Sequence, residues 1–168
     1  MEYICAYFDT QGFYINSVYH PIEVAMSGDE TIWQVRVAKK CSCCPTKSER
    51  SQMHYLTENH HGLESSVKGV ILSEVKEMVI SFYKACRTNK HFLVACRSRE
   101  AETMLDKFNI PFININHMHG ATFNAIKTGR KPCLMHKSTS ALMKCSLNLI
   151  LDMENFIRQN QITTDVPF

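Results

Sequence analysis

The residues of this chain best suited to chemistry are two cysteines and a histidine near its C-terminal end: Cys133, His136 and Cys145. Thiolate sulfur and imidazole nitrogen are common zinc ligands, and this spacing allows all three side chains to converge on one tetrahedral ion. Three protein ligands do not close a structural zinc site, so a fourth must come from elsewhere in the chain. On the residues alone, the alternative of two ordinary buried thiols and a surface histidine stays open.

A second group of possible metal ligands lies in and after a polar segment over residues 39–50. Its members are Cys41, Cys43, Cys44, His54, His60 and His61. Their spacing matches no standard zinc ribbon, which favours a polar loop with incidental thiols and exposed histidines over a second metal site.

Length and composition indicate one globular domain over residues 1–168, because 45% of the residues are hydrophobic and only 21% are charged. The chain lacks the basic start of a signal peptide and any apolar run long enough to span a bilayer. Eight cysteines without an export signal favour thiols and metal ligands over disulfides. We therefore expect an intracellular protein, cytoplasmic or nuclear, with no membrane partner. The net charge of +3 permits contact with nucleic acid without requiring it.

The first part of the chain has the alternation of antiparallel strands. Strands are expected over residues 2–9, 13–15, 22–26 and 31–37, with turns at Gly12 and at Gly28 and Asp29. Together they predict an antiparallel meander of roughly three strands.

Helices and short apolar strands alternate through the rest of the chain. Helices are expected over residues 51–58, 73–88, 100–108, 117–126 and 139–160, and strands over 92–96 and 111–115, with a basic loop over 127–137. This succession predicts an α/β fold in which a mixed sheet is flanked by helices, as in the ribonuclease H-like fold.

Several motifs resemble the Maelstrom domain, a ribonuclease H-like module of the animal germline small-RNA (piRNA) silencing pathway. They are His20-Pro21-Ile22-Glu23-Val24-Ala25, His61-Gly62-Leu63 with Lys68-Gly69-Val70, Ala95-Cys96-Arg97-Ser98-Arg99, Cys133-x-x-His136 and Cys145-Ser-Leu. The chain is shorter than that family's proteins, it lacks the high-mobility-group box that many family members carry, and residues 39–50 have no counterpart in the family. A viral, transposon-derived or other standalone relative fits as well as a true family member.

The resemblance implies one structural zinc ion held by Glu23, Cys133, His136 and Cys145. Glu23 is the ligand that the residues alone do not identify. It alternates with Ile22 and Val24, which by itself predicts a side chain that faces solvent.

The same fold includes the DEDDh exonucleases, whose acids hold two Mg²⁺ ions. Here the first acidic pair reads Asp9-Thr10-Gln11, so only its first acid is present, and Cys145 and Ile150 replace the last histidine and aspartate. The resemblance therefore argues against two-metal exonuclease activity, and Asp9 is expected to be a turn residue. A degenerate metal-dependent nuclease using Asp9, Glu100 or Glu102, and Asp152 stays open as an alternative.

Basic side chains gather in two loops that are expected at one end of the sheet. They are Lys39, Lys40, Lys47, Arg50, Lys127, Arg130, Lys131 and Lys137. Such charges could contact phosphates or simply be solvated. Four aromatic residues could stack on unpaired bases, although core packing is the commoner fate: Phe13, Tyr14, Tyr19 and Tyr55.

The resemblance implies a zinc-stabilised domain that binds single-stranded or structured RNA, with silencing-pathway proteins as further partners. It also implies unconventional endonuclease activity on single-stranded RNA, for which no residue identifies itself as nucleophile or base. The alternatives are the degenerate nuclease and a scaffold that uses the fold only to bind other proteins.

Overall fold

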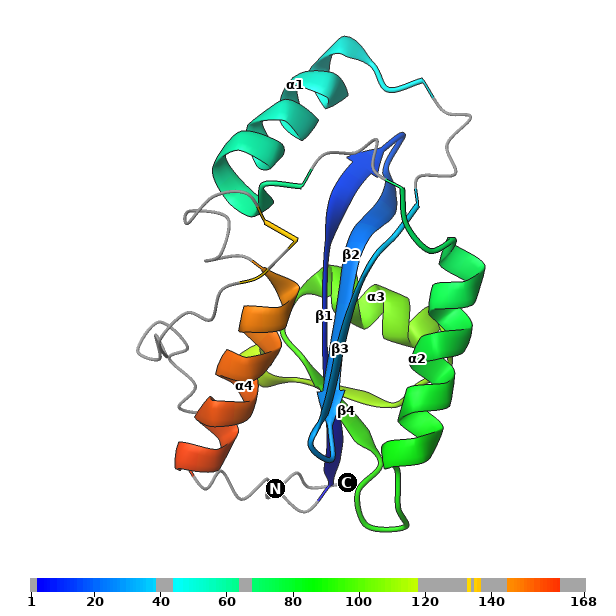
Figure 1. Cartoon of the computed structure of the whole chain (residues 1–168), viewed down its shortest axis with the longest axis vertical. Coiled ribbons are helices and arrows are strands. Elements are labelled where there is room, and N and C mark those ends of the chain that lie inside the picture. Colours follow the sequence, from blue (N-terminus) through cyan, green and yellow to red (C-terminus); the bar gives the residue numbers. More distant parts are fainter. Residues whose placement is uncertain are drawn as a thin grey trace.

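A five-stranded mixed sheet with helices on both faces forms the centre of the molecule (Figure 1). The computed structural model describes residues 3–38, 44–63, 68–117, 133, 135, 136 and 145–160. The strand order is β3-β2-β1-β4-β5. Strand β2 is antiparallel to both β1 and β3, whereas β4 is parallel to both β1 and β5. The expected mixed sheet flanked by helices is thus confirmed. Among the described helices, none is long and apolar enough to cross a membrane.

The two longest strands, β1 (Ile4–Ile15) and β2 (Val18–Gly28), form one hairpin. Its turn lies at Asn16 and Ser17, which both have positive φ angles (51° and 61°). Two such residues match the right-handed twist of the flanking strands. The turn expected at Gly12 is therefore wrong, because that glycine lies inside β1.

A β-bulge explains the glycine at position 12. Gln11 pairs with Glu23 and Gly12 pairs with Pro21, so Ile22 is an extra residue in β2. A side chain at position 12 would collide with the backbone at His20 and Pro21. Proline, which has no N–H to donate, is tolerated at a bulge because the hydrogen-bond ladder is interrupted there. The bulge re-aims the strand directly before Glu23.

The third strand, β3 (Thr31–Arg36), follows a tight turn at Asp29 and Glu30, one residue later than the predicted Gly28 turn. The parallel part consists of α2 (Leu72–Cys86), β4 (Leu93–Cys96), α3 (Arg99–Lys107) and β5 (Phe112–Asn114). All four agree closely with the expected elements.

The faces of the sheet carry different cores, because alternate residues of a strand point to opposite sides. Phe8, Val24 and Met26 pack with α2 and α3 in the larger core. Tyr7 and Ala25 pack with α4 (Ser146–Asn160) on the other face. In Figure 1, α4 and α2 accordingly lie on opposite sides of the sheet. The predicted helix over 139–160 is observed from Ser146, and residues 139–144 lie outside the described part.

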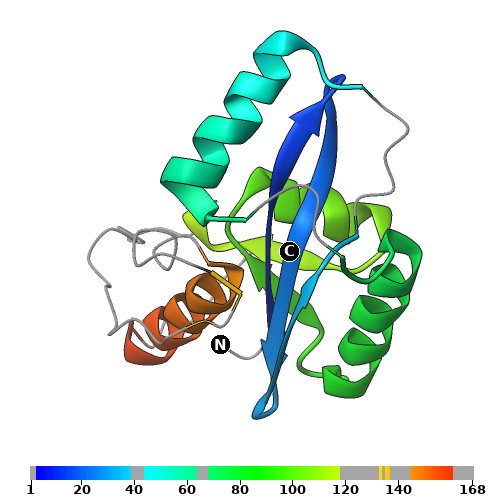
Figure 2. The same ribbon diagram turned by 45° about the horizontal axis from the view of Figure 1, so that its top comes forward.

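Helix α1 (Lys47–Leu56) lies beside the far end of the β1–β2 hairpin (Figure 2). It begins four residues before the predicted start, because Thr46 and Glu49 form a reciprocal capping box. The Glu49 carboxylate also accepts a hydrogen bond from the Asn16 backbone N–H, which ties the helix to the hairpin turn. A π-helical turn, η1 (Thr57–His61), follows and ends at Gly62 (φ 62°).

The other expected short helix falls mostly outside the described residues. Residues 118–126 of the predicted 117–126 helix are not described, and a 3-10 turn, η2 (Ile115–His117), precedes them. Most of the predicted basic loop over 127–137 is outside the described part as well.

Gly12→Ala tests the bulge. The added Cβ would lie against the His20 carbonyl oxygen and 2.9 Å from Pro21 Cα. Because backbone cannot move aside as a flexible side chain can, we expect a loss of about 1–3 kcal/mol in the free energy of unfolding by urea. Ser51→Ala, at an exposed position of α1, is the control and should stay within about 0.5 kcal/mol of the native protein. An unchanged stability for Gly12→Ala would contradict this account of the bulge.

Candidate metal centre

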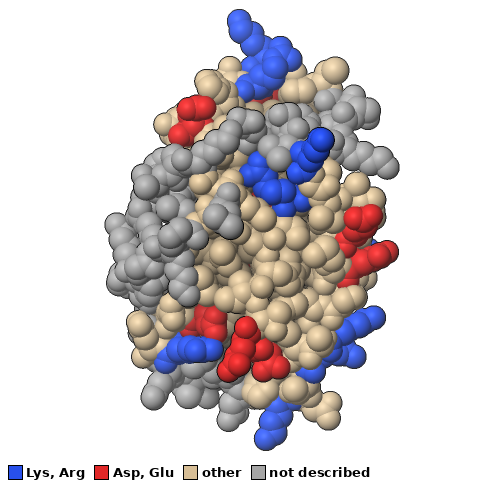
Figure 3. Space-filling view, viewed as in Figure 1, with Lys and Arg blue, Asp and Glu red and all other residues tan. Residues whose placement is uncertain are grey.

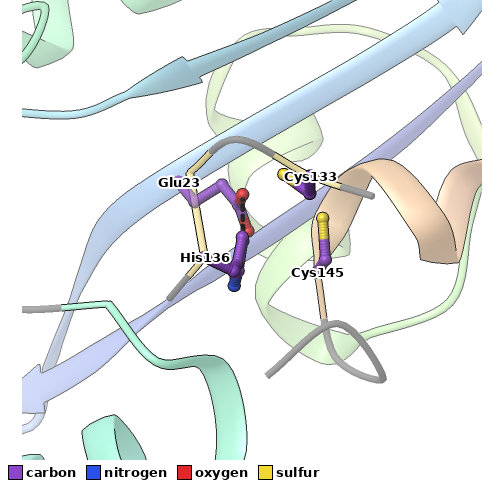
Figure 4. A group of neighbouring side chains, drawn as sticks. All are labelled: Glu23, Cys133, His136 and Cys145. Carbon is purple, nitrogen blue, oxygen red and sulfur yellow. Dashed lines mark hydrogen bonds and ion pairs between the residues drawn. The ribbon is translucent and has the colours of Figure 1, made fainter. Parts of the chain in front are cut away.

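Four side chains, one from an early strand and three from near the C-terminal end of the chain, meet on the α4 face of the sheet. They are those of Glu23, Cys133, His136 and Cys145, and their potential ligand atoms all lie within 4.8 Å of one another. All four residues are buried, Glu23 and Cys145 completely. Figure 4 shows the side chains pointing toward a common centre. Among the described residues, this is the only group of three or more His, Cys, Asp or Glu side chains that could hold an ion.

Glu23 reaches this point from the middle of β2. It lies two residues before Ala25, so it shares the face that α4 covers. Its backbone carbonyl accepts a hydrogen bond from the Thr10 hydroxyl at 2.9 Å, which helps to fix the strand at this position. The expectation of a solvent-facing Glu23 is therefore wrong: alternation identifies the face of a strand, whereas only packing decides whether that face is covered.

Cys145 stands directly before the first residue of α4. Its carbonyl oxygen accepts the first bond of the helix, from the Leu149 N–H at 3.0 Å. Its side chain therefore sits where free backbone N–H groups and the helix dipole favour negative charge. The Ser146 backbone N–H donates to Glu23 Oε2 at 3.1 Å, so the same helix end also contacts the carboxylate.

Cys133 and His136 lie on one short turn. The His136 N–H points at the Cys133 carbonyl oxygen at 3.3 Å, which brings the two side chains to the same side. Arg36 of β3 approaches the Met135 carbonyl oxygen at 3.4 Å, so this turn rests on the edge strand of the sheet. At the centre, His136 Nε2 lies 2.8 Å from Glu23 Oε1.

The donor atoms fit one tetrahedral ion of intermediate softness. With zinc–ligand bonds of about 2.0–2.3 Å, tetrahedral ligands are roughly 3.3–3.8 Å apart. Ligand atoms separated by up to 4.8 Å would therefore approach one another by about 1–1.5 Å, whereas His136 Nε2 and Glu23 Oε1, 2.8 Å apart, would separate by about 0.5 Å. Two thiolates, an imidazole and a carboxylate form a closed four-ligand set. Thiolates are poor ligands for Mg²⁺ or Ca²⁺, which prefer oxygen.

The surroundings of the Cys145 sulfur favour the protonated thiol. Burial raises the pKa of the Cys145 thiol, and the neighbouring Glu23 carboxylate raises it further. The Asn148 backbone N–H near the sulfur acts in the opposite direction. Holding a cation there would require the release of the thiol proton, because the thiolate is the form that binds metals.

Asp9 is near this cluster but does not belong to it. It is buried inside β1 rather than in a turn, so its expected turn role is wrong. Gln11 Nε2 donates to its Oδ2 at 3.2 Å. Burial raises the pKa of Asp9 to about 7. Part of this carboxyl group is therefore protonated at neutral pH.

The remaining acids of the degenerate-nuclease alternative have other partners. Glu100 Oε1 accepts a hydrogen bond from the Tyr14 hydroxyl at 3.0 Å, and Glu102 Oε1 accepts one from Asn114 Nδ2 at 2.9 Å. Neither they nor Asp152 join Asp9 in a group able to share an ion, within the part of the chain that is described.

The second cysteine-rich group does not form a metal site in the described residues. Cys41 and Cys43 lie outside them, and Cys44 and His54 are exposed. His61, predicted to be exposed, is instead buried against the Phe13 ring. Its Nδ1 accepts the Leu63 N–H at 3.1 Å, and burial lowers the pKa of His61 to about 4, so the ring is neutral at physiological pH.

Only part of the expected nucleic-acid surface can be located. Lys47 and Arg50 are exposed on α1, whereas Lys39, Lys40, Lys127, Arg130, Lys131 and Lys137 lie outside the described residues. Of the four aromatic residues, Tyr14 and Tyr55 are exposed. Phe13 is buried, so it cannot stack on a base, and Tyr19 is only partly accessible.

One polar residue beside the cluster, Gln34, could not have been identified as a site residue from the sequence pattern. Gln34 of β3 hydrogen-bonds to Glu23 and lies within hydrogen-bond distance of both cysteine sulfurs. In the sequence it is one polar residue in an alternating strand, where the usual expectation is a solvated side chain.

No protein-family model matches the chain, and no curated protein sequence matches it at a significant level.

Asp9→Asn tests the protonation of the buried acid. The folded pKa of Asp9, about 7, exceeds the ordinary 3.8, so its contribution to stability is complete below pH 4 and is lost as the pH rises through 7. An asparagine side chain has nearly the same shape as aspartic acid but does not ionise, so its contribution to stability does not fall as the pH rises. We therefore expect the variant's stability relative to the native protein to increase by about 2–3 kcal/mol between pH 5 and pH 8, measured by urea unfolding.

The matched control for this measurement is Asp106→Asn, at an exposed position of α3. Its stability relative to the native protein should be the same at both pH values. An Asp9→Asn variant whose relative stability does not change with pH would show that Asp9 is ionised in the fold.

Proposed function

We propose that this chain is a zinc-stabilised, ribonuclease H-like RNA-binding domain of the Maelstrom type, without two-metal exonuclease chemistry. The observation that carries the proposal is the meeting of Glu23 with Cys133, His136 and Cys145 in one buried cluster. These are the four positions that the resemblance assigns to zinc. They come from a strand and from a turn and a helix start that follow it more than 100 residues later in the sequence.

The order of elements supports the ribonuclease H-like part of the proposal. That fold has three antiparallel strands followed by alternating helices and parallel strands. The same succession occurs here, with β4 and β5 added in parallel beside β1. Helices α2 and α3 on one face and α4 on the other complete the arrangement.

Zinc fits the cluster better than other abundant divalent ions. Imidazole and thiolate favour zinc, which tolerates a carboxylate as the fourth ligand and has no geometric preference of its own. When bound, the ion would tie β2 to the turn at Cys133 and His136 and to the start of α4. Since all four ligands come from the protein, no open position would remain for a substrate, as in structural rather than catalytic zinc sites.

The surroundings of Asp9 support the absence of two-metal chemistry. Gln11 occupies the position of the second acid and donates a hydrogen bond to Asp9. A neutral or amide-paired carboxyl group cannot supply the dense negative charge that two Mg²⁺ ions need. We therefore propose that the protein binds RNA. An assay for RNA cleavage, described below, tests for cleavage by any other route.

Helix α1 carries the described residues that favour RNA as the partner. Lys47 and Arg50 are exposed, and the Tyr55 ring on the same helix is 57% exposed. Figure 3 shows Lys and Arg side chains at the end of the molecule that α1 occupies. Positive charge and an accessible aromatic ring on one helix suit single-stranded nucleic acid, whose phosphates and unstacked bases are both available.

Metal analysis of the purified protein tests the zinc centre. We expect one zinc per chain, and removal of zinc with a chelator should lower the melting temperature. A free zinc concentration about 1,000-fold above Kd contributes about 4 kcal/mol, which corresponds to roughly 10 °C for a domain of this size. Glu23→Gln and Cys145→Ser should each lose zinc and melt at lower temperature, because metal binding is coupled to folding.

Cys44→Ser is the control for the cysteine variant, since Cys44 is exposed and outside the cluster. It should keep one zinc and the native melting temperature. A native protein without zinc, or a Cys145→Ser variant with its full zinc content, would contradict the assignment of a zinc centre.

RNA binding is tested by titrating labelled single-stranded RNA at several salt concentrations. Reversing both charges, as Lys47→Glu with Arg50→Glu, should weaken binding roughly tenfold. The slope of log affinity against log salt concentration should also become shallower, by about 0.7 for each phosphate that the variant no longer neutralises. Lys84→Glu with Lys90→Glu changes the net charge equally at other exposed positions and should have a smaller effect.

The same RNA, incubated with Mg²⁺ or with a chelator, tests for cleavage. We expect no Mg²⁺-dependent shortening from the ends, whereas internal cuts in both conditions would add the endoribonuclease activity that the resemblance implies. If the native protein fails to bind RNA at low salt, the RNA proposal is wrong and a protein-binding scaffold becomes the better assignment.

A further inference from the structure

We propose that Gln34 is a positioning residue of the metal centre, whose side-chain amide N–H groups hold the Glu23 carboxylate and the Cys145 thiolate in place. The inference rests on the metal centre of the proposed function and adds to it a residue that the four-ligand pattern does not include.

The contacts of Gln34 single it out. Its Nε2 donates a hydrogen bond to Glu23 Oε1 and lies 3.4 Å from Cys145 Sγ. Its Oε1 lies 3.3 Å from Cys133 Sγ, which can donate while it is a thiol. One amide group thus contacts three of the four potential ligands.

The register of the sheet explains how Gln34 reaches the centre. On β3 it pairs with Ala25 of β2, whose side chain faces α4, and directly paired residues share a face. Glu23 lies two residues away from Ala25 on that same face, within reach of a long side chain diagonally across the pair. The neighbours Trp33 and Val35 point to the opposite face and pack on the larger core.

The negative charge of the cluster would be stabilised by the N–H groups of this amide. One carboxylate and two thiolates carry three negative charges, so a divalent ion leaves one net negative charge inside the protein. A buried charge without compensation is strongly unfavourable, and N–H donors aimed at the anionic ligands supply that compensation. The Ser146 N–H serves Glu23 Oε2, and the Asn148 N–H serves Cys145. Gln34 serves Glu23 Oε1 and Cys145 together.

A different role for the same residue makes the opposite prediction. If Gln34 Oε1 were itself a ligand of the ion, a carboxylate at this position would bind the cation more strongly. If Gln34 acts through its N–H groups, a carboxylate would add a fourth negative charge beside three others and would weaken binding. Gln34→Glu therefore separates the two roles, and Gln34→Met removes the donors while keeping the length of the side chain.

The experiment measures zinc affinity by competition with a chromophoric chelator, and the absorption spectrum after replacement by Co²⁺. We expect Gln34→Met to bind zinc about 10–100-fold more weakly than the native protein, the usual effect of removing a group that orients metal ligands. Gln34→Glu should bind more weakly still. The thiolate-to-cobalt absorption band should shift in Gln34→Met, because the Cys145 sulfur loses a hydrogen bond.

Gln52→Met is the matched control, since Gln52 is exposed on α1. It should leave both affinity and spectrum unchanged. Gln34 is itself only half-buried, and circular dichroism of each zinc-free variant establishes that it is folded before affinities are compared.

Each outcome decides between the positioning role and the zinc centre on which it rests. Weaker binding in Gln34→Met and Gln34→Glu, with the shifted band, supports the positioning role. Native affinity in both variants, or tighter binding in Gln34→Glu, overturns it while leaving the zinc centre intact. A native protein that binds neither zinc nor cobalt overturns the centre and the inference together. Should Gln34→Met fail to fold, the affinity of Gln34→Glu relative to the native protein still decides.

Discussion

The structure is organised around a carboxylate in its interior. Glu23 is completely buried in the central hairpin, where an isolated negative charge would be strongly unfavourable. Its two oxygens contact the His136 imidazole, the Gln34 amide and the Ser146 backbone N–H. These partners come from a turn, the edge strand and the start of α4. Hydrogen bonds to this one acid therefore link three elements of the fold.

Two acids on the same sheet face are stabilised in different ways. Asp9 and Glu23 both point toward the α4 side, but the pKa of Asp9 rises to about 7, because burial disfavours its charge more than its hydrogen bonds favour it. Glu23 has several donors and two sulfurs beside it, as a metal ligand would. The difference places the group of potential metal ligands around Glu23 and leaves Asp9 outside it.

Periodicity predicted the elements whose form depends on local sequence. Strand β3, helices α2 and α3, and strands β4 and β5 agree closely with expectation, because alternating or helical spacing of apolar residues is a local property. The errors lie where distant backbone decides. Gly12 suggested a turn, but it is required by close approach to His20 in a bulge. The early start of α1 had a local signal in Thr46 and Glu49, which composition alone obscured.

For the candidate site, the sequence by itself determined the types of ligand and the spacing of Cys133, His136 and Cys145, because these are properties of neighbouring residues. Glu23 entered only through a resemblance, since its alternation with Ile22 and Val24 indicates exposure as readily as burial. The tertiary structure alone decided that α4 covers this face, that Glu23 lies beside His136, and that Gln34 reaches both Glu23 and Cys145. The physical reason is that strand pairing and helix packing bring together residues more than 100 positions apart, and no local pattern records which side chains will meet.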